Sequence, residues 1–136
     1  MSKIEQTLSI IKPDAVERNL TTEIKNIFIK NNLNIKDSKK IHISKDEAAE
    51  FYKVHQSKPF YNDLCSYLSS GPIVVMILEG PNAIAHNRKL MGATDPKNAD
   101  TNTIRQLYGI SIDKNSVHGS DSLDNAKKEI DYFFKN

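Results

Sequence analysis

Residues 73–78 read Ile-Val-Val-Met-Ile-Leu, an uninterrupted apolar run between Ser70-Gly71-Pro72 and Glu79-Gly80. Its length and its β-branched content are typical of a fully buried strand. A second buried strand is predicted for Thr7–Lys12, where Pro13 stops it. Because helical patterns separate these strands, the sequence predicts a sheet covered by helices, which is an α+β fold (an α/β sandwich).

Helical and strand patterns alternate along the rest of the chain. Thr21 or Thr22 begins a predicted helix that ends at Asn31-Asn32. Ser44-Lys45-Asp46-Glu47 is a capping box, in which serine and glutamate side chains satisfy each other's backbone amides at the start of a helix. Further elements are predicted as a strand within 35–43, a short helix around 64–68, and a helix that Asn82 caps and that continues to about Met91.

Length and composition limit the classes of protein that fit. The 136 residues predict a single domain over residues 1–136. A net charge of +2 argues against a dedicated nucleic-acid binder, because such proteins concentrate basic residues on one face. Cys65 is the only cysteine, which excludes an intrachain disulfide and a cysteine-based zinc site. Neither a signal-peptide pattern nor a membrane-spanning run is present, so we expect a cytoplasmic protein without a membrane partner.

The stretch with the most chemical groups is Asn115-Ser116-Val117-His118-Gly119-Ser120-Asp121-Ser122. It places one imidazole among hydroxyl, carboxylate and amide groups, with no bulky apolar side chain in the four positions that follow. Ser120, Asp121 or Ser122 can cap the helix predicted after them, so we expect His118 just before a helix N-terminus. Backbone amides and the positive end of the helix dipole can receive an anion there. His118 is therefore a candidate nucleophile.

Phosphate groups, if they bind, must be held by side chains. The five glycines form neither a Walker loop nor a G-x-G-x-x-G fingerprint. The polar stretch from Gly92 to Asn102 is too long for a simple turn and is expected to be functional. Lysine, arginine and threonine side chains suited to phosphate oxygens stand where predicted elements end or flank that stretch, namely Lys12, Arg88, Thr94 and Arg105.

Five blocks of the sequence resemble the nucleoside diphosphate kinases, in that family's order and spacing. They are residues 7–16, Lys58-Pro59-Phe60, residues 88–94, Thr103-Ile104-Arg105 and residues 115–122. Together they cover essentially the whole chain, and the asparagine-x-x-histidine-glycine-serine-aspartate signature is highly specific. The short C-terminus is similar to that of bacterial members.

This resemblance implies a fold, an activity and partners. The fold would be ferredoxin-like, βαββαβ, with an antiparallel sheet. The activity would be transfer of the γ-phosphate of a nucleoside triphosphate, mainly ATP, to nucleoside diphosphates by a ping-pong mechanism, with broad base and sugar tolerance. Mg²⁺ would be held mainly through the nucleotide phosphates, with no protein ligand assigned. The chain would form a cytoplasmic homo-oligomer, either a tetramer or a hexamer.

The resemblance also assigns roles to individual residues. His118 would accept the phosphate on Nδ1, and Glu129 would hold the other ring nitrogen. Tyr52 would lie beside His118, and Ser120 would support the local network. The nucleotide would be bound by Lys12, Arg88, Thr94 and Arg105 through its phosphates, by Asn115 together with Lys12 through its sugar hydroxyls, and by Phe60 stacked on its base.

Simpler interpretations remain open for several of these residues. Tyr52 can be a core side chain, Phe60 a packing anchor and Glu129 an exposed helix charge. We expect surface or structural roles for the other histidines, His42, His55 and His86. For the whole chain, a catalytically silent nucleotide-binding or regulatory module and a secondary nucleic-acid binder are the alternatives.

The sequence departs from the family's commonest pattern in a few places. Many members have glycines where Asn19 and Thr22 stand, and proline-glycine where Thr101-Asn102 stand. Gln106-Leu107 replace the usual glycine-aspartate, and Pro81 is another local variation. Since the loop around Thr101-Asn102 contributes to subunit contacts in the family, its change bears on the oligomeric state.

Overall fold

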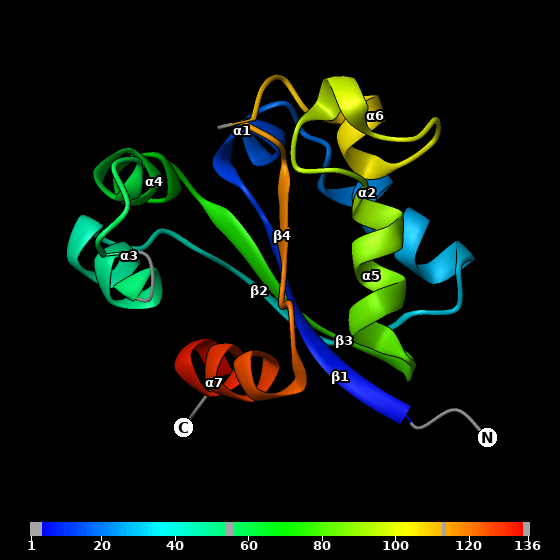
Figure 1. The fold of residues 1–136 in the computed structure, drawn as a ribbon. Helices are drawn as coiled ribbons and strands as arrows, with labels where there is room; N and C mark the ends of the chain where they lie inside the picture. The colour runs from blue at the N-terminus through cyan, green and yellow to red at the C-terminus, as the bar shows by residue number, and fades with distance from the viewer. Residues whose placement is uncertain (1–3, 54–55, 113, 135–136) are drawn as a thin grey trace.

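The computed structural model describes residues 4–53, 56–112 and 114–134, and its centre is a four-stranded antiparallel sheet (Figure 1). The sheet order is β2-β3-β1-β4, so the first strand lies inside the sheet and the last one at an edge. The strands are β1 (Ile4–Ile11), β2 (Asn34–Ile41), β3 (Ile73–Pro81) and β4 (Val117–Gly119). This order, with helices between the strands, confirms the predicted α+β, ferredoxin-like βαββαβ fold.

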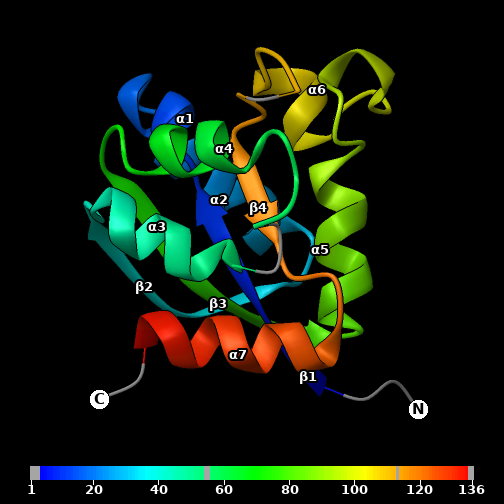
Figure 2. The same ribbon diagram turned by 60° about the vertical axis from the view of Figure 1, so that its left-hand side comes forward.

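Helices cover both faces of the sheet. On one face lie α1 (Pro13–Glu17), α2 (Thr21–Lys30), α5 (Ala83–Met91) and α6 (Ile104–Tyr108); η2 (Pro96–Asn98) precedes α6. On the other face lie α3 (Lys45–Phe51), α4 (Tyr61–Leu68) and α7 (Leu123–Phe134). Figure 2 shows α7 and α3 packed side by side in front of the sheet.

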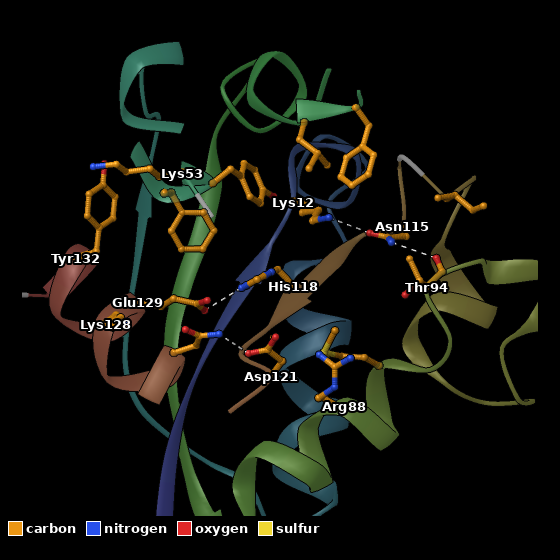
Figure 3. A pocket seen from close by; sticks show the side chains of 18 of the residues that line it. Lys12, Lys53, Arg88, Thr94, Asn115, His118, Asp121, Lys128, Glu129 and Tyr132 are labelled. Atoms are coloured by element: carbon orange, nitrogen blue, oxygen red, sulfur yellow. Dashed lines mark hydrogen bonds and ion pairs between the residues drawn. The ribbon is translucent and has the colours of Figure 1, made fainter. Parts of the chain in front are cut away.

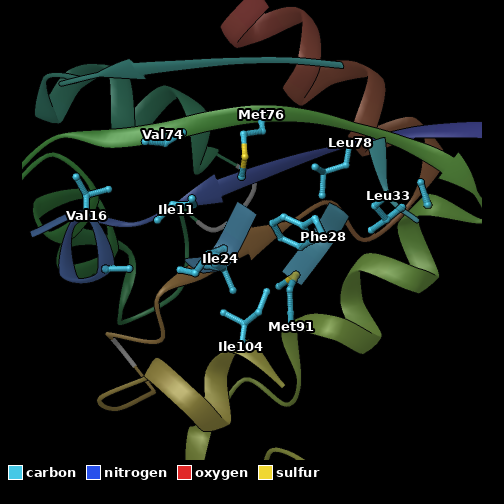
Figure 4. Close-up of a cluster of buried hydrophobic side chains, with 13 residues drawn as sticks. Ile11, Val16, Ile24, Phe28, Leu33, Val74, Met76, Leu78, Met91 and Ile104 are labelled. Carbon is cyan, nitrogen blue, oxygen red and sulfur yellow. The ribbon is translucent and has the colours of Figure 1, made fainter. Parts of the chain in front are cut away.

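Each face of the sheet has its own hydrophobic core. Alternate residues of β3 point to opposite sides, so Val74, Met76 and Leu78 contribute to one core and Ile73 and Val75 to the other. The first core is drawn in Figure 4, where Phe28 of α2 packs under the sheet. Burial of each such large apolar side chain contributes roughly 1.5–3 kcal/mol. The two cores explain why residues 73–78 are apolar without interruption.

Local signals in the sequence agree with most element boundaries. The capping box is present, because Ser44 Oγ accepts from the Glu47 amide at 3.1 Å and Glu47 Oε1 accepts from the Ser44 amide at 2.9 Å. Pro13 occupies the first turn of α1, so β1 ends at Ile11 and not at Lys12. The strand predicted up to residue 43 ends at Ile41. Asn82 immediately precedes α5, as predicted, and its backbone there is left-handed (φ 50°).

Within the described residues, no helix is both long and apolar enough to cross a membrane. The longest of the described helices, α7, has 12 residues and an amphipathic sequence. Its inward side carries the buried Ala126 and Phe133, and Glu129 lies on that same side, one helical turn from each of them.

Candidate active site

A cleft of about 810 Å³ brings together residues from distant parts of the chain (Figure 3). It lies between α5 and the residues after α6 on one side, and α3, α4 and α7 on the other, with β4 along its floor. Nine of the ten residues predicted for the site line it: His118, Glu129, Tyr52, Lys12, Phe60, Arg88, Thr94, Arg105 and Asn115. The tenth, Ser120, is buried and contacts Glu129.

His118 is held by a carboxylate of α7. Its Nε2 lies 2.9 Å from Glu129 Oε1 (Figure 3). Ser120 Oγ donates to the same oxygen at 2.9 Å. An ionised carboxylate can only accept hydrogen bonds, so Nε2 carries the proton in this contact. The neutral imidazole then keeps its lone pair on Nδ1, which is the form required of a nucleophile.

His118 precedes a helix that Ser122 caps, as the capping residues predicted, but it lies in a strand, which was not predicted. His118 is the middle residue of β4 and pairs with Ile10 of β1, so the sheet, and not a helix end, holds its backbone. The helix begins only at Leu123, and Ser122 caps it by accepting from the Asn125 amide at 3.1 Å. Glycine and aspartate are uncommon in strands, so the sequence pattern gave no signal for this short strand.

Two arginines supply positive charge to the cleft. Arg105, only 8% exposed, donates to the carbonyl oxygens of Gly92 at 3.0 Å and Val117 at 2.9 Å. Burial lowers the pKa of Arg105 to about 10, and the nearby charge of Arg88 acts in the same direction. Arg105 therefore remains charged at neutral pH although a second cation lies close to it. The negative charge of a bound anion would offset both the burial of the Arg105 charge and its repulsion by Arg88.

Lys12 and Asn115 connect two of the predicted phosphate- and sugar-binding segments to the loop after α5. Lys12 Nζ donates to Asn115 Oδ1 at 3.0 Å, and Asn115 Nδ2 donates to the backbone oxygen of Thr94 at 3.1 Å (Figure 3). Both side chains are buried, so their geometry is fixed by the fold. The stretch that begins at Gly92, which the sequence predicted to be functional, thus contributes to the cleft through Thr94.

Two apolar side chains of the cleft are exposed to solvent. Phe60, which immediately precedes α4, is 45% exposed, and Ile112 is 54% exposed. Exposed apolar side chains inside a cleft can contact a flat ring without reading its hydrogen-bonding edge. Sequence reasoning did not select Ile112; its only signal was an isoleucine within a polar segment.

Two aromatic residues at the C-terminal end of α3, Phe51 and the following Tyr52, line the cleft. Tyr52 lines the cleft and belongs to the core beneath it; burial chiefly raises the pKa of its phenol, with smaller effects from Cys65 and Glu129. The ring of Phe51 meets the imidazole of His118 edge to face, with centroids 5.3 Å apart and planes at 75°. The family resemblance assigned Tyr52 to this neighbourhood, whereas Phe51 was not selected from the sequence.

The remaining histidines do not line the cleft in the described part of the chain. His42 Nε2 lies 2.8 Å from the carbonyl oxygen of Ser69, and His86 is on α5. His55, for which a surface or structural role was expected, lies outside the described residues. Polar cleft residues that were not predicted from the sequence are Glu50, Lys53, Asp121, Asn125, Lys128 and Tyr132.

Gly119 allows α5 to pack closely against β4. A Cβ atom at this position would lie 2.3 Å from Asn87 Nδ2 and 2.6 Å from Met91 Sδ. Gly119→Ala is therefore expected to destabilise the fold by about 1–3 kcal/mol, as overpacking does. The free energy of unfolding, measured in denaturant, checks this. Gly71→Ala is the matched control, since its Cβ would meet only Pro13 Cβ at 3.6 Å; equal losses in the two variants would contradict the close contact.

Comparison with known proteins gives one consistent family. The family model described as nucleoside diphosphate kinase matches residues 5–136. A nucleoside diphosphate kinase from a Nitratiruptor species is 59% identical over 131 residues, covering 96% of this chain and 96% of that protein. Another, from Granulibacter bethesdensis, is 57% identical over 131 residues, covering 96% of this chain and 94% of that one.

Solved structures that resemble this chain belong to the same family. The nucleoside diphosphate kinase of Aquifex aeolicus superposes with a TM-score of 0.96 at 39% identity, over 98% of this chain and 97% of that chain. The enzyme of the same name from Encephalitozoon cuniculi gives a TM-score of 0.93 at 36% identity, over 97% of this chain and 90% of that chain.

Proposed function

We propose a phosphohistidine mechanism for this chain, because it belongs to the nucleoside diphosphate kinase family. Its activity is the transfer of a γ-phosphate from nucleoside triphosphates to nucleoside diphosphates. In the proposed mechanism, His118 carries the phosphate between the two nucleotides. The observation that supports it most directly is the 2.9 Å contact between His118 Nε2 and Glu129 Oε1 at the floor of the cleft.

Both half-reactions use the same imidazole nitrogen. In the first, the Nδ1 lone pair of His118 attacks the γ-phosphorus, the bond to the bridging oxygen breaks, and the nucleoside diphosphate leaves with that electron pair. In the second, a terminal oxygen of the acceptor diphosphate attacks the same phosphorus, and the N–P bond breaks to return the lone pair to Nδ1. Glu129 keeps the Nε2 proton in place and stabilises positive charge on the ring during both steps.

The phosphates are proposed to lie between Arg88, Arg105, Thr94 and Lys12. Phosphoryl transfer requires in-line placement and charge stabilisation more than any covalent help from the protein, and guanidinium groups can bind phosphate oxygens in pairs. The charge of Arg88 near the buried Arg105 is consistent with a site that an anion occupies. Arg88 and Arg105 would orient the chain of phosphates so that its terminal group faces His118.

The chemistry of the cleft fits Mg²⁺ that arrives with the nucleotide. Among the described residues, no group of three or more histidine, cysteine, aspartate or glutamate side chains could form a metal cage. Mg²⁺ commonly binds through one or two carboxylates together with substrate phosphates, and Asp121 is a carboxylate of the cleft. When bound, Mg²⁺ would neutralise charge on the phosphate oxygens.

The sugar and the base are proposed to bind through different kinds of contact. Asn115 and Lys12, hydrogen-bonded to each other, are polar groups suited to the sugar hydroxyls. Phe60 and Ile112 offer apolar surface to the base, which supports broad base tolerance. A cytoplasmic homo-oligomer, tetrameric or hexameric, remains the prediction that follows from the family resemblance.

An exchange assay tests this function. The γ-phosphate of ATP is expected to pass to GDP, CDP and UDP, with the parallel initial-rate lines of a ping-pong mechanism. Phe60→Ala should raise the KM for all of these diphosphates by a similar factor, roughly 5- to 150-fold, because stacking contributes about 1–3 kcal/mol per base. Leu123→Ala, which removes an exposed apolar side chain outside the cleft, is the control. A loss confined to one base would contradict stacking, and converging lines would contradict the phosphoenzyme.

A further inference from the structure

Asp14 is a buried carboxylate with an unusually large set of partners. It is the only buried aspartate or glutamate among the described residues, with 5% of the residue exposed. Oδ1 accepts from the hydroxyl of Tyr67, and Oδ2 accepts from Ser116 Oγ at 2.8 Å and from Arg18 Nη2 at 3.1 Å. Both carboxylate oxygens are therefore engaged, and the charge is paired with an arginine.

These contacts join parts of the chain that surround the nucleotide cleft. Tyr67 belongs to α4, the helix that Phe60 precedes. Arg18 follows α1 and also donates to the backbone oxygen of Tyr108, at the end of α6, the helix that carries Arg105. Ser116 lies between Asn115 and β4. One carboxylate thus connects, directly or through Arg18, the segments that supply base, phosphate and sugar contacts.

Asp14 does not itself reach the cleft. It lines a second cavity, of about 430 Å³, together with Arg18, Tyr67 and Lys114, and is absent from the lining of the larger cleft. The segments 12–14 and 114–116 contribute to both: Lys12 and Asn115 line the first cavity, and Asp14 and Lys114 line the second. Any effect of Asp14 on nucleotides must therefore pass through its neighbours.

Ser116 links Asp14 to Lys12 and Asn115, two residues that line the cleft. The Lys12 amide donates to the Ser116 carbonyl at 2.8 Å, and Lys12 Nζ donates to Asn115 Oδ1 at 3.0 Å. Ser116 has a left-handed backbone (φ 73°), a conformation that non-glycine residues adopt only when surrounding contacts impose it. The hydrogen bond from Ser116 Oγ to Asp14 is such a contact. Releasing it would free Ser116 to relax and Asn115 to turn away from Lys12.

The geometry points to Asp14 as a positioning residue that holds Lys12 and Asn115 in place for the nucleotide. This inference deepens the proposed function and rests on it, since it concerns the binding of the nucleotide at the same cleft. Burial and the hydrogen bond to Asp14 raise the pKa of Tyr67, so its hydroxyl remains a donor throughout the working pH range. An asparagine at position 14 would turn one acceptor oxygen into a donor group that faces other donors.

Asp14→Asn tests the inference with two measurements. The dissociation constant of ADP, measured by calorimetry, is expected to rise about tenfold, in the range found when a hydrogen bond to a charged group is lost. Phosphorylation of His118 by phosphoramidate, a small donor with neither sugar nor base, should fall by a clearly smaller factor than ADP affinity, because Arg88, Arg105 and Thr94 are still in place for its phosphate. A merely structural defect would weaken ADP binding and slow the phosphorylation of His118 by the same factor.

Two further variants keep the test decisive. Ser116→Ala removes one donor to Asp14 but keeps the charge pair with Arg18, and it should weaken ADP binding in the same direction even if Asp14→Asn folds poorly. Leu78→Val lowers stability from within the core and away from both cavities, so it should leave ADP affinity unchanged. Unchanged ADP affinity in both Asp14→Asn and Ser116→Ala, or equal losses with ADP and phosphoramidate, would overturn the inference.

A failure of the proposed function would look different. It would appear as an unsubstituted protein that forms no phosphohistidine from ATP or phosphoramidate. The calorimetric comparison of ADP binding does not depend on that chemistry, so it tests the role of Asp14 whether or not the phosphohistidine forms.

Discussion

His118→Asn is expected to abolish the phosphoenzyme and to reduce nucleotide exchange by at least about 10⁴-fold, as loss of a covalent nucleophile does. Asparagine preserves polarity and approximate size, but its amide nitrogen has no lone pair available for attack on phosphorus. With labelled ATP, the unsubstituted protein should give a phosphoprotein that is labile in acid and stable in alkali. The variant should give none. ADP binding should be largely retained, because the groups proposed to hold the nucleotide are untouched.

His86→Asn is the matched control for this experiment. It makes the same substitution on α5, at a histidine that does not line the cleft. Its phosphoenzyme and exchange rate should equal those of the unsubstituted protein. Label that persists on His118→Asn, or label lost equally from both variants, would remove His118 from the reaction.

Arg88→Ala is expected to slow exchange by about 10²–10³-fold, the effect typical of removing one donor that stabilises transition-state charge. The same substitution should not lower the stability of the nucleotide-free protein. The charge of Arg88 adds to the burial that lowers the pKa of Arg105 to about 10, so below that pH, where Arg105 is protonated, two like charges repel each other. Removing Arg88 relieves this repulsion, and Tm without nucleotide should stay equal or rise.

Lys89→Ala provides the comparison, because it removes the neighbouring positive charge on the same helix outside the cleft. It should change neither the exchange rate nor the gain in Tm that ADP gives. Arg88→Ala should show a smaller gain in Tm with ADP than the unsubstituted protein. If Arg88→Ala exchanges phosphate at an unchanged rate, this arginine does not orient the phosphates.

Local signals predicted much of the fold. The apolar run at 73–78, the proline after β1 and the capping box at Ser44 are short-range features, and the structure contains a strand, a strand end and a helix start at these places. Boundaries that depend on pairing partners were less predictable. β3 continues to Pro81 because β1 pairs with it as far as Ile4, which no local pattern reveals.

The candidate site was predictable to the extent that its residues occur in recognisable blocks. Lys12, Arg88, Arg105 and His118 come together in the cleft as the resemblance implied. Phe51, Ile112 and Asp14 were not selected, because their roles arise from tertiary contacts. The ring of Phe51 meets that of His118, Ile112 lines the cleft, and Asp14 accepts a hydrogen bond from Ser116. In the sequence, each is an ordinary core, loop or turn residue.

The close packing of Gly119 against Asn87 sets a distance within the candidate active site. Asn87 and Arg88 are consecutive on α5, and Gly119 follows His118 on β4, so the contact between one pair of neighbours fixes the spacing of the other. The contact therefore sets the spacing between His118, the proposed nucleophile, and Arg88, which is proposed to bind phosphate. Shifting α5 by one residue would turn Arg88 by about 100° around the helix axis and out of the cleft. Many surface residues of α5 can be substituted, but an insertion in this helix would separate Arg88 from His118.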